Sequence, residues 1–232
     1  METKNRLGIF IFLGLLSIAV SLPVAVKKYT DASRNVVVKG LCEKQVDADR
    51  AIWPIVYKEG GNSVAALSSI VATKNKAVVG WLKDAGFTDA EINVSSPKIE
   101  DLASTGYNEH RAYDYVLTSV ITVCTDRVKD VVDLQKHQFD LLSKGIAIGS
   151  GNTWEYPVTY EYTSLSEIKA GMVEEAILNA RASAEKFAKD SGSRLGKIIS
   201  ATQGQFSIND RDAHTPYIKT VRVVSTVNYS LK

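Results

Sequence analysis

The chain of 232 residues contains few of the residue types on which the commonest metal and redox sites depend. It has two cysteines, Cys42 and Cys124, and three histidines, without CxxC or cysteine–histidine spacing. This pattern argues against zinc sites and thioredoxin-like chemistry. Each cysteine lies in a strand-like run, which favours two buried thiols over a disulfide. Export to an oxidising compartment would give the disulfide more weight.

The sequence also lacks an excess of charge of either sign. Lys and Arg number 28 and Asp and Glu number 26, so the formal net charge is only +2. No run of basic residues with interleaved aromatic residues marks a nucleic-acid-binding surface. We therefore expect no nucleic-acid partner.

Motifs of common enzyme families are missing as well. The run GIAIGSGN at 145–152 has three glycines but matches neither G-x-G-x-x-G nor GxxxxGK[ST], and it leads into a strand rather than a helix. A phosphate cradle needs the N-terminus of a helix behind it, so turn formation explains these glycines better. No serine occurs as G-x-S-x-G. We expect a protein that is not an enzyme, with no catalytic, cofactor-binding or metal-binding residue and no cofactor.

One predicted helix carries the most metal-like pattern in the chain. Asp133 and His137 are i,i+4 neighbours there and could chelate a metal or act as an acid–base pair. Asp130 and Asp140 belong to the same segment, but so do Lys129 and Lys136. A solvated polar face is the favoured interpretation, because one helix supplies only part of a coordination sphere.

Two loops place histidine beside acidic residues. These are Glu109 with His110, and the run at 210–214, which ends with Asp212, Ala213 and His214. Such combinations are common on protein surfaces, and the pattern does not bring the three histidines together. We interpret both loops as surface features.

In contrast to these absences, the N-terminus has a long apolar run. Residues 1–6 contain Lys4 and Arg6, and residues 7–26 contain no charge. About 20 apolar residues span a bilayer as a helix, whereas the apolar core of a signal peptide has about 7 to 15. The length favours a retained single-pass anchor, and Lys4 and Arg6 favour a cytoplasmic N-terminus with the domain on the outer side of the membrane. A cleaved signal peptide is the alternative.

After a polar linker at 27–35, the residue patterns predict alternating strands and helices up to residue 232. Val36 to Tyr57 is typical of a hairpin with a VDAD turn, in which Trp53, Ile55 and Tyr57 share a face and Pro54 requires an edge or a bulge. Helical periodicity follows at 62–85, with Asn62 or Ser63 as the cap and Gly86 as the stop. A strand is predicted around 92–99.

The second half of the chain continues this alternation. A strand at 113–125 precedes a helix that Asp126 caps and Gly145 ends. A strand begins near Thr153 and the longest helix covers about 164–190, which could form a parallel crossover to a strand at 195–206. A last strand covers 219–231.

The longest helix has an apolar stripe at steps of three, four and one. We expect its alanines to allow close approach to a sheet, and its charged back to carry Arg181, Glu185 and Lys189 at i,i+4. The predicted stripe consists of Leu165, Ile168, Met172, Val173, Ala176, Ile177, Ala180, Ala184, Phe187 and Ala188.

The predicted order ββαββαβαββ indicates an α+β fold, with an antiparallel or mixed sheet packed against helices and one apolar helix in front. No linker divides residues 36–232, which we expect to form one domain. Aromatic side chains recur on two predicted strands and favour sheet packing, with a binding face or subunit contact as the alternative. They are Tyr113, Tyr115, Trp154, Tyr156, Tyr160 and Tyr162.

The segment AILNARASAEKFAKDSGSRLGKI resembles the signature of the SIMPL domain family, which includes YggE-like bacterial envelope proteins. The matching residues are Ala176, Ala180, Arg181, Ala184, Phe187, Ala188, Gly192, Leu195, Gly196 and Ile198. Two earlier segments, VVVKGLCEKQVDADRA and NKAVVGWLKDAGFTDAEINVSSPKI, are similar to its first strand and to its helix, turn and strand. Cys42 stands where the family usually has glycine, Ala48 replaces a proline before Asp49, and Ser183 replaces a basic residue.

This resemblance implies an exported or envelope-associated α+β domain that often self-associates, linked in some members to oxidative-stress tolerance. It supplies no catalytic residue. We therefore expect a non-enzymatic envelope protein that acts as a homo-oligomer or through an envelope protein partner. With the resemblance, the N-terminal segment is expected in the bacterial inner membrane with the domain facing the periplasm, or the domain is secreted to the periplasm after signal cleavage. The alternative is a small-ligand or metal-binding periplasmic module.

Overall fold

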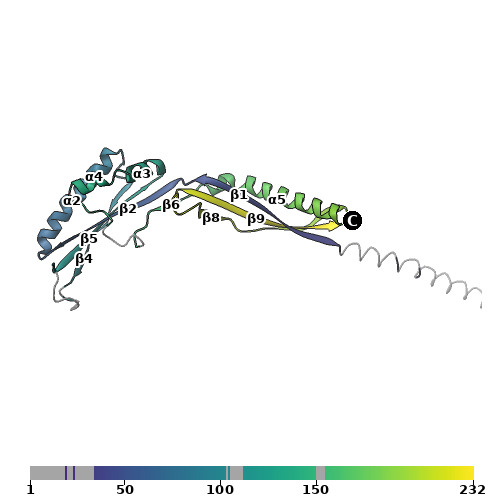
Figure 1. Ribbon diagram of the computed structural model, residues 1–232, viewed down its shortest axis with the longest axis horizontal. Coiled ribbons are helices and arrows are strands. Elements are labelled where there is room, and N and C mark those ends of the chain that lie inside the picture. Colours follow the sequence, from purple (N-terminus) through teal and green to yellow (C-terminus); the bar gives the residue numbers. More distant parts are fainter. Residues whose placement is uncertain (1–18, 20–22, 24–33, 103, 105–111, 150–154) are drawn as a thin grey trace, which may run out of the picture. The chain divides into compact units, whose positions relative to one another are not determined.

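The computed structural model describes residues 19, 23, 34–102, 104, 112–149 and 155–232. They form an α+β fold with two sheets (Figure 1), and the contacts within them divide the chain into two compact units. The first unit comprises residues up to 44, 166–207 and 221–232, and the second comprises 45–165 and 208–220. No helix within the described ranges is both long and apolar enough to cross a membrane. The apolar segment predicted at 7–26 lies outside them apart from Ala19 and Pro23.

The second unit contains a five-stranded sheet in the order β3-β5-β2-β6, with β4 also paired with β5. Every pairing in it is antiparallel. Helices α2, α3 and α4 accompany this sheet (Figure 1), and a continuous apolar core includes residues of all three. The elements are β2 (Arg50–Gly61), α2 (Val64–Asp84), β3 (Ile92–Val94), β4 (Lys98–Asp101), β5 (Tyr115–Thr125), α3 (Val128–Gln135), α4 (Phe139–Ser143) and β6 (Thr159–Glu161).

The predicted hairpin between the first two strands is wrong. Strand β1 (Asn35–Asp47) neighbours β9 (Ile218–Leu231), whereas β2 pairs with β5 and β6. At the junction the amide of Ala48 donates to the carbonyl of Tyr217 (2.8 Å) and the amide of Asp49 donates to the carbonyl of Glu161 (2.9 Å). These bonds direct the chain from one sheet into the other instead of closing a turn.

The Asp49 side chain strengthens this junction. Its carboxylate accepts hydrogen bonds from the backbone N–H groups of Thr163 (2.7 Å) and Ser164 (2.8 Å), immediately before α5 begins at Leu165. Partial burial raises the pKa of Asp49, but the hydrogen bonds from Ser164 and Thr163 outweigh it and the net pKa is lowered. The carboxylate therefore caps the backbone N–H groups of the two residues that lead into α5, from a distant part of the chain.

The predictions made for β2 and α2 from the pattern of neighbouring residues are confirmed. Trp53, Ile55 and Tyr57 are all buried on one face. Pro54 pairs with Thr122 of β5, while the strand on the other side, β6, reaches only Ile52, so the proline lies where β2 is an edge. Helix α2 begins after Ser63, whose hydroxyl accepts a hydrogen bond from the amide of Ala66, and it is followed by Gly86 with φ +91°.

The helix predicted after residue 126 is divided in two. The amides of Lys136 and His137 donate to the carbonyls three residues back, at Asp133 and Leu134, which ends α3 before α4 begins. Asp126 is not the cap: the residue before α3 is Arg127, which makes no capping side-chain bond. The amide of Arg127 instead donates to the hydroxyl of Thr125 (3.1 Å).

Two predicted strands are also divided or shortened. The strand expected around 92–99 becomes β3 and β4, separated by a segment that contains Pro97. The strand expected from Thr153 begins only at Thr159, and residues 150–154 lie outside the described residues. Between β7 (Leu195–Gln203) and β9 a further short strand, β8 (Ser207–Asp210), pairs with β9.

The first unit is built around α5 (Leu165–Asp190) and a sheet in the order β1-β9-β7. Figure 1 shows α5 running along β1 and β9. The predicted parallel crossover through α5 is wrong, because β6 and β7 belong to different sheets and β7 pairs antiparallel with β9. The core of this unit contains Val36, Ala180, Ala184, Ala188, Val227, Tyr229 and Leu231.

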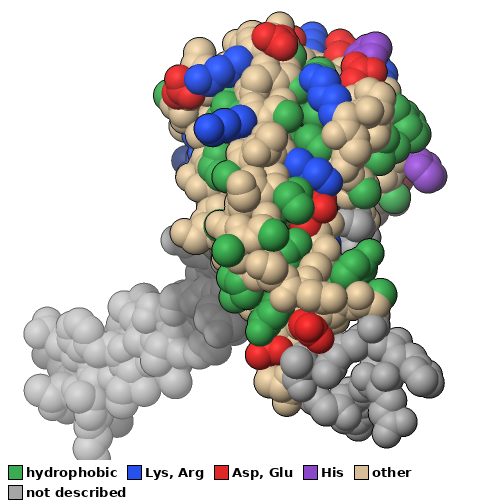
Figure 2. All heavy atoms as spheres, turned by 90° about the vertical axis from the view of Figure 1, so that its left-hand side faces the viewer, with side chains coloured by type: hydrophobic (Ala, Val, Ile, Leu, Met, Phe, Trp, Pro, Cys, Tyr) green, Lys and Arg blue, Asp and Glu red, His purple; other side chains and the backbone are tan. Residues whose placement is uncertain are grey.

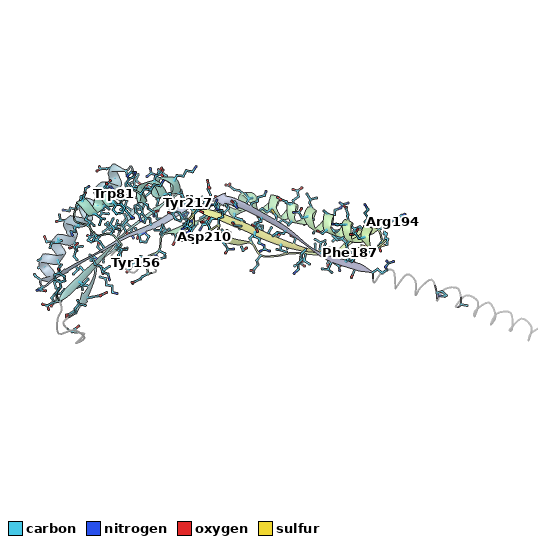
Figure 3. All side chains as sticks on the ribbon, in the orientation of Figure 1. Trp81, Tyr156, Phe187, Arg194, Asp210 and Tyr217 are labelled. Carbon is cyan, nitrogen blue, oxygen red and sulfur yellow. The ribbon has the colours of Figure 1, made fainter. Side chains whose placement is uncertain are left out.

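The buried stripe of α5 is narrower than predicted. Its fully buried residues recur strictly at every fourth position and are Met172, Ala176, Ala180, Ala184 and Ala188. Phe187, which the prediction placed in the stripe, is 52% exposed (Figure 3). Alanine allows the helix to lie close to β1, where a Cβ on Gly40 would be 1.8 Å from the carbonyl oxygen of Ala176. On the exposed back, Arg181 and Glu185 form the predicted ion pair (2.8 Å).

Candidate functional site

The candidate pair Asp133 and His137 does not lie on one helix. Helix α3 ends at Gln135, so His137 lies in the turn beyond it and the helical i,i+4 relationship is lost. Asp133 pairs with Lys136 at 2.6 Å, and the hydrogen bond from Lys136 lowers the pKa of the carboxyl. In the part of the chain that the structure describes, no cluster of three or more His, Cys, Asp or Glu side chains could hold a metal.

The histidine-containing loops do not form an acid–base site in the described residues. Glu109 and His110 lie outside those residues. Asp212 accepts hydrogen bonds from the backbone amides of His214 (2.9 Å) and Thr215 (2.8 Å), and hydrogen bonds from the Thr215 hydroxyl and from Arg211 lower the pKa of its carboxyl. Asp210, labelled in Figure 3, forms an ion pair with the buried Lys219. The carboxylates in this loop are engaged in holding its shape.

The two cysteines are free thiols in different environments. Cys42 is buried, as predicted, and burial raises the pKa of its thiol, with a further rise from the hydrogen bond to Glu175. The prediction was wrong for Cys124, which is exposed. It occupies an outward position in β5, whose inward positions are taken by residues such as Val123.

The glycine run near residue 145 contributes to turn structure where it is described. Gly145 and Gly149 have φ of +73° and +80°, and the amide of Gly149 donates to the carbonyl of Val56 in β2 (3.1 Å). Ile146 between them is fully buried. These features agree with a turn that connects α4 to the sheet.

Most of the aromatic side chains serve packing. Tyr160 is buried, lies edge-on to Tyr217 with ring centroids 6.0 Å apart, and donates its hydroxyl to Gln135 (3.1 Å). Tyr113 is half exposed, but its ring covers the backbone of Gly60, where a Cβ would lie 2.4 Å from the ring. Trp154 lies outside the described residues. The sheet-packing interpretation is supported for Tyr160 and for Tyr115, which packs against the same core.

Charge does not mark a functional surface on the face that can be seen in Figure 2. On the face that Figure 2 shows, basic and acidic side chains are interspersed with hydrophobic ones and do not gather into a patch of one sign. This agrees with the near-zero net charge and the absence of a basic stripe in the sequence.

The most unusual surface of the first unit lies along the outer side of α5 and along β7. We call it the α5–β7 surface and define it by Ile177, Leu178 and Ile198, which line one hollow between helix and strand. Leu178 (58%) and Ile198 (52%) are large apolar side chains that are more than half exposed. All residues of β7 from Lys197 to Gln203 are exposed, although β7 is hydrogen-bonded to β9. A strand in the middle of a packed sheet would bury alternate residues.

Two shallow hollows follow this surface. One, of about 620 Å³, lies among apolar residues of α5 such as Val173 and Ile177 and reaches Gln203 at the end of β7. The other, of about 340 Å³, is lined by Ile177 and Leu178 again, together with Ile198, Tyr229 and the charged pair Arg181 and Glu185. Because Ile177 and Leu178 line both, the hollows form one groove between helix and strand. It arises because the buried stripe of α5 contacts β1 and β9, so β7 extends past the helix.

The segments that build this surface match a known family model. The model described as SIMPL, a protein of unknown function (DUF541), matches residues 36–229. The chain belongs to the SIMPL family. No curated protein matches the chain.

The structure gives the small residues of the SIMPL-like segment a physical role. Ala176 and Ala180 allow the close approach of β1 to α5, and Gly192, with φ +66°, follows the helix. Gly196 lies against β9, where a Cβ would be 2.2 Å from the hydroxyl oxygen of Ser230. This segment is therefore the scaffold that holds α5 and β7 to the sheet.

Sequence reasoning missed the exposure of β7. The run LGKII reads as a buried strand, because three of its five residues are large and apolar. The sequence did contain a sign of this exposure, because apolar and polar residues do not alternate here. Ile198 and Ile199 are consecutive, so their side chains cannot both face one core. The ladder between β7 and β9 is irregular at this point.

Proposed function

We propose that this SIMPL protein is a non-enzymatic cell-envelope protein that acts through self-assembly or through contact with a protein partner. The observation that carries the proposal is the α5–β7 surface, which exposes Leu178 and Ile198 beside a strand that, among the described residues, pairs only with β9. Contiguous apolar surface of this kind is costly to leave in water and is typical of protein–protein contact sites. A role in envelope or oxidative-stress tolerance is the physiological setting that the family resemblance implies.

The shape of the groove favours a macromolecular partner over a small one. Small-molecule sites are concave and bury most of the ligand surface. The groove between α5 and β7 is shallow, with its apolar residues more than half exposed at Leu178 and Ile198. A protein surface can cover such a groove along its whole length, whereas a small ligand there would remain largely in water.

We place the domain outside the cytoplasmic membrane, held by the apolar segment at 7–26. Its support is the length of that uncharged run and the basic residues Lys4 and Arg6 before it. Protease added to the outside of spheroplasts should then degrade the domain while the membrane stays intact. Release of the whole protein into the periplasmic fraction would favour a cleaved signal peptide instead.

The central proposal is tested by crosslinking in cells, followed by light scattering of the full chain in mild detergent. We expect crosslinked species and a mass above that of one chain. Leu178→Asp and Ile198→Asp should reduce both signals, whereas Leu41→Asp, an apolar residue exposed on β1, serves as the matched control. A strict monomer with no crosslinked partner in cells would overturn the proposal.

A small-ligand function remains the second candidate, and one feature of the second unit favours it. A hollow of about 330 Å³ lies beside Tyr217 and contains Lys129, Lys136, Asp47 and Asp133, with Val128 and Val132 as its apolar part. Charged groups of both signs beside an aromatic ring suit a small zwitterion. The test is the melting temperature of the protein with free amino acids, with Lys129→Ala as the control.

The metal version of this candidate is tested separately by metal analysis of the purified protein and of His137→Ala. Equal, negligible metal content in both proteins, with no thermal shift on addition of divalent cations, would eliminate it.

A further inference from the structure

The outer edge of β7 is an unprotected strand edge. In the sheet order β1-β9-β7, no strand of the described residues pairs with the side of β7 that faces away from β9. Backbone N–H and C=O groups along such an edge form a template for another strand. Seven consecutive residues, Lys197 to Gln203, are exposed there. The edge therefore offers both hydrogen-bonding groups and apolar side chains.

The opposite edge of the same sheet is better protected. Strand β1 carries charges along its length, at Lys39, Glu43, Lys44 and Asp47, whereas β7 carries only Lys197. Charged side chains are the commonest device by which proteins prevent edge-to-edge pairing. Of the two edges of this sheet, β7 is thus the one suited to pairing.

We propose that two copies of the chain associate by antiparallel pairing of their β7 strands about a twofold axis near Ala201. This inference rests on the proposed self-assembly and names its contact. Identical edges that pair with each other form a closed, self-complementary interface, which stops at two copies. The sheets of the two copies then become one continuous sheet.

The position of the axis follows from the regularity of β7. The ladder with β9 is irregular between Leu195 and Ser200, but from Ser200 to Gln203 successive residues pair with successive residues of β9. A strand that pairs without bulges along one edge presents regularly spaced backbone N–H and C=O groups along its other edge, whereas a bulge disturbs that spacing. Pairing centred on Ala201 uses the regular part.

Charge favours the antiparallel direction. In a parallel pair in register, Lys197 would lie beside the Lys197 of the second copy, and like charges directly opposite are destabilising. In an antiparallel pair centred on Ala201, the two lysines lie on opposite sides of the axis, about 25 Å apart at strand spacing. That separation exceeds the screening length of about 8 Å at physiological salt.

The same axis brings the two α5 helices onto one face of the joined sheet, in opposite directions. The groove of each copy then faces the groove of the other across the paired β7 strands.

Single cysteines test the register in the full chain, with Cys124→Ser removing the exposed native thiol. Ala201→Cys should form a disulfide-linked dimer under mild oxidation, because a residue near the axis lies close to its own copy. Lys197→Cys and Val37→Cys, the latter on β1, should stay monomeric on non-reducing gels. Efficient crosslinking at Lys197→Cys would indicate parallel pairing, and crosslinking at Val37→Cys would indicate the other edge; either result overturns the inference.

A second measurement separates this inference from the proposed function. Ile199→Lys places a charge on the exposed edge, and we expect at least a tenfold weaker self-association by light scattering, while Val37→Lys has no effect. Circular dichroism should show that both variants stay folded, because both positions are exposed. If the chain still assembles in both variants and no crosslink forms at Ser200, Ala201 or Thr202, the β7 pairing is wrong but self-assembly stands. A monomeric wild-type chain overturns both.

Discussion

Gly40 of β1 and Ala180 of α5 lie so close together that a Cβ atom on Gly40 would be 2.5 Å from the backbone nitrogen of Ala180 and 2.8 Å from its Cβ. Neither a larger residue in β1 nor a larger residue in the helix fits this contact. The packing of the first unit therefore depends on two small residues that are 140 positions apart in the sequence.

Gly40→Ala should destabilise the protein by about 3 kcal/mol or more, because the new methyl group meets backbone atoms that cannot rotate away. The control is Gly171→Ala in α5, where a Cβ would have no neighbour within 4 Å. Removing a helical glycine at an open position should stabilise by about 0.5–1 kcal/mol. Urea unfolding followed by circular dichroism measures both changes, and equal stability of the two variants would contradict the close contact.

Glu91 should make the stability of the second unit depend on acid pH. The hydrogen bonds from the Thr125 hydroxyl and the Thr88 amide, with Arg127 nearby, lower the pKa of Glu91 from 4.5 to about 2. Because the pKa is depressed in the folded state, the stabilisation is present above pH 4.5 and is lost as the pH falls towards 2. We expect a loss of about 1–2 kcal/mol over this window after allowance for solvent screening.

The matched variant for this prediction is Glu91→Gln, which cannot ionise. The difference in unfolding free energy between wild type and variant should shrink as the pH is lowered from 5 to 2.5. A difference that stays constant over this range would show that the charge of Glu91 does not contribute.

Asp49→Ala should cost about 1–2 kcal/mol, because the amides of Thr163 and Ser164 lose their acceptor at the start of α5. Asp47→Ala, at an exposed position two residues earlier, is the control and should change stability by less than about 0.5 kcal/mol. Thermal unfolding measures the difference. Equal melting temperatures for the two variants would show that the cap is dispensable.

Thiol labelling should distinguish the two cysteines. In the native protein Cys124 should react rapidly with an aromatic disulfide reagent, whereas Cys42, which is 1% exposed and has a raised pKa, should react only after unfolding. Cys124→Ser should then abolish the fast phase. No reactive thiol in the native wild type, with both thiols appearing after reduction, would indicate a disulfide instead.

Features that depend on a few neighbouring residues were predictable from the sequence. The α5 ion pair between Arg181 and Glu185 followed from their spacing, and helix α2 followed from its periodicity, its Ser63 cap and Gly86. These features arise from backbone geometry and local hydrogen bonds, which short segments already contain. The family assignment was likewise available from the order of the segments, and the family model confirms it.

Features that depend on distant partners were not predictable in this way. The cap that Asp126 was expected to provide is absent, since Arg127 precedes α3 and makes no capping side-chain bond, and the apolar Phe187 is 52% exposed. The sequence pattern shows that a residue is apolar but does not show whether another element covers it. For this reason the α5–β7 surface emerged only from the structure.

By itself, the sequence determined the α+β composition, the positions of the long helices, the uncharged N-terminal run and the SIMPL membership, because each follows from local periodicity or from a characteristic order of residues. Only the tertiary structure decided which strands pair. Strand β1 lies beside β9 and not β2, and where β1 ends the amides of Ala48 and Asp49 bond to Tyr217 and Glu161. Pairing of strands is settled by contacts between residues far apart in the chain, and among the described residues those contacts leave β7 at the edge of its sheet.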